Sequence, residues 1–155
     1  MQAIRYLVGI AALFALATVP AAFAQAPAPV TDGKVTYVTG GIGESEVSAM
    51  QAQAREYSAL LEFVEVEPGN PRGVWTADVG VTIKAGKEPL ASFNATGPLL
   101  LLRLPAGRYT IEATHGGVAI SKALDIRAGA RSVKERFIWR AQGSLGGEAR
   151  SQSQK

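Results

Sequence analysis

Cysteine is absent from the 155-residue chain, and histidine occurs only once. Without cysteine the chain cannot form a disulfide bond or a thiolate metal site, and it offers no cysteine for lipid attachment. The single histidine, His115, excludes sites with several histidine ligands, and any Ser-His-Asp catalysis would depend on this one residue. We expect His115 to be a solvated residue of a tight turn, because the two glycines after it mark a position that serves the geometry of the backbone. The sequence therefore predicts no enzyme activity, no metal site and no cofactor.

The chain also has little excess of positive over negative charge. The chain has 16 Lys and Arg residues against 13 Asp and Glu residues, which gives a net charge of +3. The basic residues are scattered along the sequence and form no cluster that would follow a phosphate backbone. We therefore expect no nucleic-acid partner.

The one long apolar run stands at the N-terminus. Leu7–Val19 is almost entirely apolar but is shorter than the roughly 20 residues that span a bilayer. Ala22 and Ala24 flank one large residue, a pattern typical of a signal-peptidase site. We predict a signal peptide over residues 1–24 and cleavage between Ala24 and Gln25. The product would be periplasmic or secreted, with no membrane attachment after cleavage.

The rest of the chain is expected to contain one domain. Residues 25–32 include two prolines and no apolar periodicity, which predicts a flexible leader. Residues 33–140 carry the periodic apolar pattern. Residues 141–155 are rich in Gly, Ser, Gln and charge, which predicts a disordered tail.

Alternating apolar and polar residues predict short strands separated by turn signals. The clearest alternation runs from Val74 to Lys84 and includes Trp75. The expected strands lie near residues 35–37, 60–66, 74–84, 90–96, 99–104, 108–114, 118–126 and 133–139. This pattern predicts a mainly β fold, an antiparallel β-sandwich of about seven to eight strands with one N-terminal α-helix.

Four aromatic side chains allow two interpretations. Trp75, Phe93 and Trp139 share strand faces with aliphatic residues, and Tyr57 lies on the apolar stripe of the expected helix. We expect all four in the core, because such faces are usually buried. The alternative is a platform on which sugar rings stack.

A helix is predicted near residues 44–57. Glu44 and Glu46 would lie in its first turn, where carboxylates complement the helix dipole. Its apolar residues recur at helical spacing and make one stripe, which comprises Val47, Met50, Ala54 and Tyr57.

The glycines before this helix are candidates for a binding loop. Gly41-x-Gly43 follows a strand and opens a helix, as phosphate-binding loops do. Glu46 stands where the third glycine would be, and with Glu44 it would repel a pyrophosphate. The spacing therefore favours an ordinary strand-to-helix turn, and Gly41, Gly43, Glu44 and Glu46 are weak candidates for ligand contacts.

Leu104-Pro105-Ala106-Gly107-Arg108-Tyr109-Thr110-Ile111 resembles the Leu-Pro-x-Gly-x-Tyr-x-Val signature of carboxypeptidase regulatory-like domains. Upstream, Ala77–Ile83 and Ala95–Leu99 look like that family's Ala-x-Val-x-Val strand and Thr-x-x-Gly turn. The resemblance covers residues 74–139 and implies a seven-stranded sandwich of the prealbumin or transthyretin type. The segment from Tyr37 to Glu46 also resembles small exported proteobacterial proteins that carry this domain without an assigned activity.

The motif also has a physical explanation that needs no family. Proline fixes the turn, glycine permits an unusual backbone angle, and Tyr109 buries its ring while its hydroxyl seeks a hydrogen-bond partner.

Two functions fit these patterns. The first is a non-enzymatic binding or interaction module of the cell envelope, whose partner is an envelope protein or a sugar. The alternative is a carbohydrate-binding or hydrolase-like activity around residues 40–46. The sequence indicates neither a specific ligand nor an oligomeric state.

Overall fold

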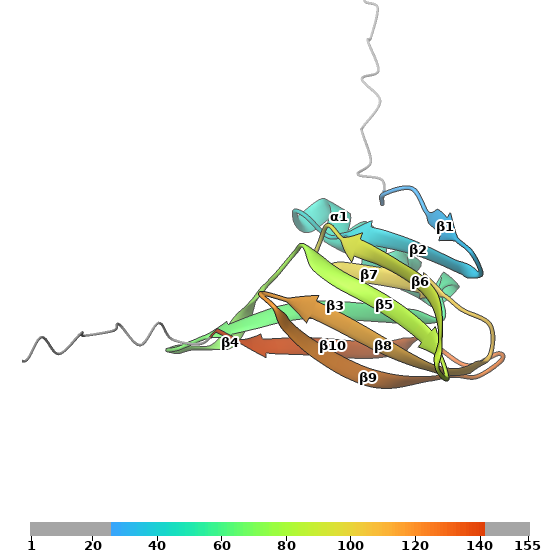
Figure 1. The fold of residues 1–155 in the computed structure, drawn as a ribbon. Helices are drawn as coiled ribbons and strands as arrows, with labels where there is room; N and C mark the ends of the chain where they lie inside the picture. Colours follow the sequence, from blue (N-terminus) through green and yellow to red (C-terminus); the bar gives the residue numbers. More distant parts are fainter. Residues whose placement is uncertain (1–25, 142–155) are drawn as a thin grey trace, which may run out of the picture.

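Two β-sheets pack face to face, and a helix covers the outer side of one of them (Figure 1). The computed structural model describes residues 26–141, which form ten strands, one α-helix and one short 3-10 helix. The expected β-sandwich with an N-terminal helix is confirmed.

Six strands form the larger sheet, sheet A, and four form sheet B. Sheet A has the order β1 (Val30–Asp32), β2 (Val35–Gly40), β7 (Leu99–Arg103), β3 (Ala59–Glu67) and β10 (Val133–Arg140), and β4 (Asn70–Trp75) pairs with the second half of β3. Sheet B has the order β6 (Glu88–Ala95), β5 (Val79–Ala85), β8 (Gly107–His115) and β9 (Val118–Ile126).

One ladder departs from the antiparallel pattern. β10 pairs with β3 in parallel, whereas the other ladders of the described residues are antiparallel. In this ladder Arg136 lies opposite Glu62, and its Nε and Nη2 donate to Glu62 Oε2 at 2.9 and 2.7 Å. The last strand thus closes sheet A beside a strand about 70 residues earlier in the chain.

The main core lies between the sheets and follows the predicted alternation. Phe63 on β3 and Phe137 on β10 are fully buried, with ring centroids 5.9 Å apart. Trp139 is buried beside them, and its Nε1–H donates to the carbonyl of Val118 on β9 at 2.8 Å. Trp139 therefore fills the core, as expected, and also links sheet A to the edge of sheet B.

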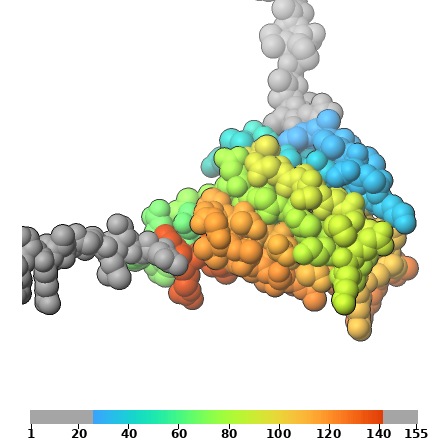
Figure 2. Space-filling model, in the orientation of Figure 1, coloured from blue at the N-terminus to red at the C-terminus, as the bar shows by residue number. Residues whose placement is uncertain are grey.

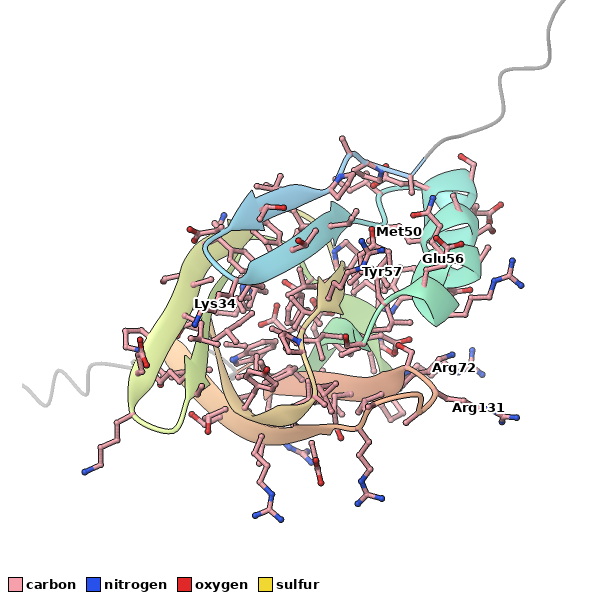
Figure 3. All side chains as sticks on the ribbon, turned by 90° about the vertical axis from the view of Figure 1, so that its right-hand side faces the viewer. Lys34, Met50, Glu56, Tyr57, Arg72 and Arg131 are labelled. Carbon is pink, nitrogen blue, oxygen red and sulfur yellow. The ribbon has the colours of Figure 1, made fainter. Side chains whose placement is uncertain are left out.

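A second, smaller core lies between sheet A and the helix. α1 (Glu44–Gln53) and the 3-10 helix η1 (Ala54–Glu56) together cover the expected helical segment. Met50 and Tyr57 point from this segment onto the sheet, as Figure 3 shows, and both are buried. They pack with residues on three strands and with the first described residue, namely Ala26, Val38, Leu60, Leu99 and Leu101. The predicted apolar stripe of the helix is confirmed.

The opposite face of the molecule is polar. Figure 2 views the protein from the side of sheet B, where β5, β6, β8 and β9 make most of the visible surface. Thr82 and Ser92 share a hydrogen bond of 3.1 Å across this face, and Lys84 pairs with Glu112 at 2.9 Å. Cross-strand pairs of this kind are typical of a sheet face in contact with water.

The segment expected as the clearest single strand is two strands. β4 ends at Trp75 in sheet A, and β5 begins at Val79 in sheet B. Between them Asp78 adopts a positive φ of 55°, which Asp tolerates better than most residues. The expectation of one strand over Val74–Lys84 was therefore wrong. Apolar and polar residues continue to alternate across the crossing, so the pattern gave no sign that the chain changes sheets.

The expected leader is structured in part. Val30–Asp32 forms β1 and pairs with β2, so the flexible segment predicted over residues 25–32 does not extend to its end. Ala26 is also buried against the helix cluster. Three residues are too few to show a period of two, which is why the pattern missed this strand. The predicted signal peptide and cleavage site, with Ala22, Ala24 and Gln25, and residues 142–155 of the predicted tail lie outside the described residues.

The Leu-Pro-x-Gly-x-Tyr corner joins β7 to β8. The ring of Tyr109 is buried, and its hydroxyl donates to the carbonyl of Pro105 at 2.9 Å. Gly107 has no positive φ; a Cβ there would lie 3.3 Å from the tyrosine hydroxyl. The expected role of tyrosine is confirmed, whereas Gly107 serves close packing and not an unusual backbone angle.

Candidate functional site

A hollow of about 580 Å³ opens beside the start of the helix. The strand-to-helix turn and the helix form one side of it, and Trp75 at the end of β4 forms the other. Its lining consists of Gly41, Gly43, Glu44, Val47, Ser48 and Trp75. The structure thus brings three of the four candidate loop residues together with an aromatic ring that the sequence pattern assigned to the core.

The two candidate glycines shape the turn. Gly41 and Gly43 have φ values of 92° and 88°, a region that side chains strongly disfavour. A Cβ at Gly41 would also lie 2.8 Å from Cγ of Leu99, which packs beneath it. A Cβ at Gly43 would have no atom within 4 Å, and Gly43 lines the hollow. Both glycines therefore have a structural reason to be present, and they leave the hollow unobstructed.

The two candidate carboxylates have different positions. Glu46 turns back, and its Oε1 accepts a hydrogen bond of 2.7 Å from the backbone N–H of Gly41. This contact resembles the glutamate half of a capping box, in which a third-position carboxylate holds the chain entering the helix. Glu44 is exposed and lines the hollow. Of the pair, only Glu44 lines the hollow.

Trp75 is exposed, contrary to expectation. Its residue is 45% accessible, because it lies on the outer face of sheet A opposite Val64. Ile138 lies opposite Val64 on the other side, in β10, and is 47% accessible. Paired residues share a sheet face, so the tryptophan and the isoleucine flank buried Val64 in one row. Ile42, between the two candidate glycines, is 68% accessible. We call Ile42, Trp75 and Ile138 the apolar patch.

The other three aromatic residues follow the expectation more closely. Tyr57 and Trp139 are buried, and Phe93 is half-buried. The Phe93 ring stacks on Tyr37 with centroids 3.7 Å apart, which joins β6 to β2 across the sandwich.

The exposure of one patch residue, Ile138, could have been predicted from the sequence. Lys134, Arg136 and Arg140 occupy alternate positions on β10 and are exposed, whereas Phe137 is buried. Ile138 has the same parity as the charged residues, so the period of two already placed an isoleucine on the polar side. The position of Trp75 had no such signal, because the alternation gives no indication that the chain changes sheets.

His115 is not a solvated turn residue. It ends β8, its side chain is 23% exposed, and its ring lies 5.6 Å from that of Trp139. Its Nε2 lies 3.0 Å from Thr76 Oγ1 and 3.6 Å from Glu65 Oε2. In a catalytic triad the hydroxyl and the carboxylate contact different ring nitrogens. Here both contacts involve the same nitrogen, so the geometry is not that of a triad.

Residues 26–141 contain neither a cluster of metal-ligating side chains nor a membrane-spanning helix. Within this range no group of three or more His, Asp or Glu side chains could hold a metal ion. No helix in the same range has the length and apolar character needed to cross a membrane.

Comparison with known proteins assigns no family. No protein-family model matches the chain, and no curated protein gives a significant match.

Proposed function

We propose that this protein is an exported, non-enzymatic binding module of the cell envelope that holds a partner protein on the apolar patch. The observation that carries the proposal is the exposure of Trp75 beside a hollow, with Ile42 and Ile138 exposed nearby. Exposed aromatic residues next to a concavity are typical of the residues that contribute most to protein association. Scattered exposed apolar residues are ordinary, whereas a tryptophan that lines a hollow and shares a sheet row with an exposed isoleucine favours an interaction site.

The neighbourhood of the patch favours a protein segment with apolar and acidic side chains. Arg140 lies on the same face of β10 as Ile138 and forms no ion pair with a described residue. A partner that inserts an apolar side chain into the hollow could place a carboxylate against this cation.

A sugar ligand is the second candidate. Trp75 offers an aromatic face, and Glu44 and Ser48 offer hydrogen-bonding groups on the opposite wall of the hollow. The two aliphatic neighbours, Ile42 and Ile138, favour the protein over the sugar. A hydrolase-like role has less support, because a pair of free carboxylates is the usual requirement and Glu46 is engaged by Gly41.

The proposal includes the cellular location and the domain family. The N-terminal pattern of residues 1–24 supports export to the periplasm or beyond. The Leu-Pro-x-Gly-x-Tyr corner and the sandwich support a relationship to carboxypeptidase regulatory-like domains. Such domains are prealbumin-like sandwiches, and similarity of fold alone does not identify the ligand of a domain.

Site-specific photo-crosslinking in the native host tests the proposal. A photoreactive amino acid replaces Ser48, which lines the hollow, or Lys87, an exposed residue of the β5–β6 hairpin. We expect one defined protein adduct from position 48 and none from position 87. Trp75→Ala should reduce that adduct at least tenfold, since truncating an aromatic anchor costs about 2 kcal/mol or more of binding.

The matched control is Val118→Ala, which shortens an equally exposed apolar residue on β9. It should leave the adduct unchanged, and circular dichroism should show that both variants are folded. Equal adducts from positions 48 and 87, or an adduct that is insensitive to Trp75→Ala, would refute the site. Quenching of Trp75 fluorescence by peptidoglycan fragments, with no protein adduct, would replace the protein partner by a sugar.

A further inference from the structure

A second hollow, of about 500 Å³, lies at the other end of the helix. One wall is the end of α1 with the start of η1, and the other is the β9–β10 loop with the first residues of β10. Its lining consists of Gln51, Ala54, Arg55, Gly129, Ala130, Arg131, Ser132 and Lys134. Figure 3 shows Arg131 on this loop, which passes below the helical segment that contains Met50 and Glu56.

The charged residues that line this hollow are all positive. Arg55, Arg131 and Lys134 come from three different segments, and no carboxylate is among the lining residues. None of the three forms a salt bridge with a described residue. Three cations in one concavity repel one another, so their convergence favours a bound anion.

The carboxylates nearest along β3 and β10 have other partners. Glu62 is held by Arg136 at 2.7 Å, and Glu135 is held by Lys122 at 2.9 Å. Lys134 shares a shallow surface with both acids but pairs with neither. Arg55 has a structural reason to be present, because a cation near a helix C-terminus is favoured by the helix dipole. That reason does not extend to Arg131 or Lys134.

A hydroxyl without a partner lies in the same wall. Ser132 Oγ is buried and forms no hydrogen bond, the one such side-chain atom found in residues 26–141. A serine hydroxyl has three staggered positions about χ1, and Ser132 is among the residues that line the hollow. An anion there would give this donor an acceptor, and buried hydroxyls in folded proteins usually have one.

We propose that this basic hollow binds a phosphate-bearing group, with Arg131 and Lys134 as its main ligands and Arg55 and Ser132 beside them. Arginine suits phosphate because its planar guanidinium can donate two parallel hydrogen bonds, and lysine adds a compact charge. The volume exceeds that of a bare phosphate ion, so the group belongs either to a soluble phosphorylated compound or to a phospholipid headgroup. The hollow and the apolar patch involve opposite ends of α1, so this inference does not depend on the proposed function.

Two probes distinguish the sources. The chain from residue 25 onward, the expected exported form, is titrated with inorganic phosphate and followed by amide NMR. It is also floated with vesicles that contain phosphatidylglycerol in phosphatidylcholine. We expect phosphate to shift the amides of Gly129 and Ala130, and Arg131→Ala with Lys134→Ala to weaken binding at least tenfold. Co-flotation that this double variant abolishes would assign a lipid headgroup, and phosphate binding without flotation would assign a soluble ligand.

The control removes the same charge elsewhere. Lys87→Ala with Arg108→Ala deletes two exposed cations of sheet B and should change the affinity for phosphate less than twofold. Equal weakening by the two double variants would mean that only net charge matters and would overturn the site. Absence of amide shifts at the β9–β10 loop would overturn it as well.

Discussion

Ser58 is expected to contribute more to the free energy of unfolding than a serine usually does. It lies just before β3, and its Oγ donates to the carbonyl of Leu104 at 2.8 Å and accepts the N–H of the same residue at 2.9 Å. Its backbone N–H donates to Leu102, and its carbonyl accepts from Val133. All of its polar groups are therefore engaged, and one residue ties β3 to the ends of β7 and β10.

Ser58→Ala removes both side-chain hydrogen bonds and leaves the polar groups of buried Leu104 without them. At about 1 kcal/mol for each bond, the free energy of unfolding should fall by about 2 kcal/mol. For a domain of this size the melting temperature should fall by roughly 8 °C. The midpoint of urea unfolding should fall by about 1 M, with an unchanged slope, if the slope is about 2 kcal/mol per M.

Ser132→Ala is the matched control. This serine is also partly buried, but its Oγ has no hydrogen-bond partner among the described residues. Its removal should leave the stability in phosphate-free buffer unchanged or slightly higher, because a buried hydroxyl without a partner is unfavourable. If Ser58→Ala unfolds at the wild-type midpoint, or if the two variants lose equal stability, the proposed role of the Leu104 hydrogen bonds is wrong.

Three further predictions follow from other parts of the molecule. Phe137→Ala should lower the free energy of unfolding by about 3–5 kcal/mol in urea titrations, because it leaves a cavity in the main core, and a loss below about 1 kcal/mol would contradict that burial. Gly41→Ala should destabilise the domain by about 2 kcal/mol or more, since it combines a positive φ with a contact on Leu99, whereas Gly86→Ala, with a positive φ in open space, should cost about 1 kcal/mol; equal losses would refute the packing role. Intact-mass measurement of the exported protein should give a chain that begins at Gln25, and a mass that retains the preceding residues would contradict the signal peptide.

The sequence predicted those parts of the fold that depend on local periodicity. The alternation along residues 108–126 gave the β8–β9 hairpin, and the stripe from Val47 to Tyr57 gave the buried side of the helix. The aliphatic run over residues 99–104 predicted a buried strand, and its first four leucines divide alternately between the two cores. In each case the burial is a property of one continuous segment, which a local pattern can show.

The parts that could not be predicted depend on contacts between distant segments. The parallel pairing of Phe137 with Phe63 joins residues 74 positions apart, and no local pattern specifies a partner at that distance. The candidate site has the same origin, because Trp75 at the end of β4 meets the 41–48 segment, which precedes it in the chain by the whole of β3. Sequence reasoning found the loop but not the ring opposite it. An aromatic residue in an alternating segment gives the same pattern whether its face is covered or exposed.

The two outer faces of the sandwich differ in a way that supports sheet A as the binding side. Sheet B presents polar cross-strand pairs, such as Thr82 with Ser92, and needs no cover. Sheet A needs cover over its first strands, which the helix supplies through Met50. The helix packs on β2 and β7 and leaves the row of Trp75 and Ile138 exposed. When a partner buries large apolar residues that a sheet face exposes, the free energy of the system falls. A partner on this face would complete the cover that the helix leaves unfinished.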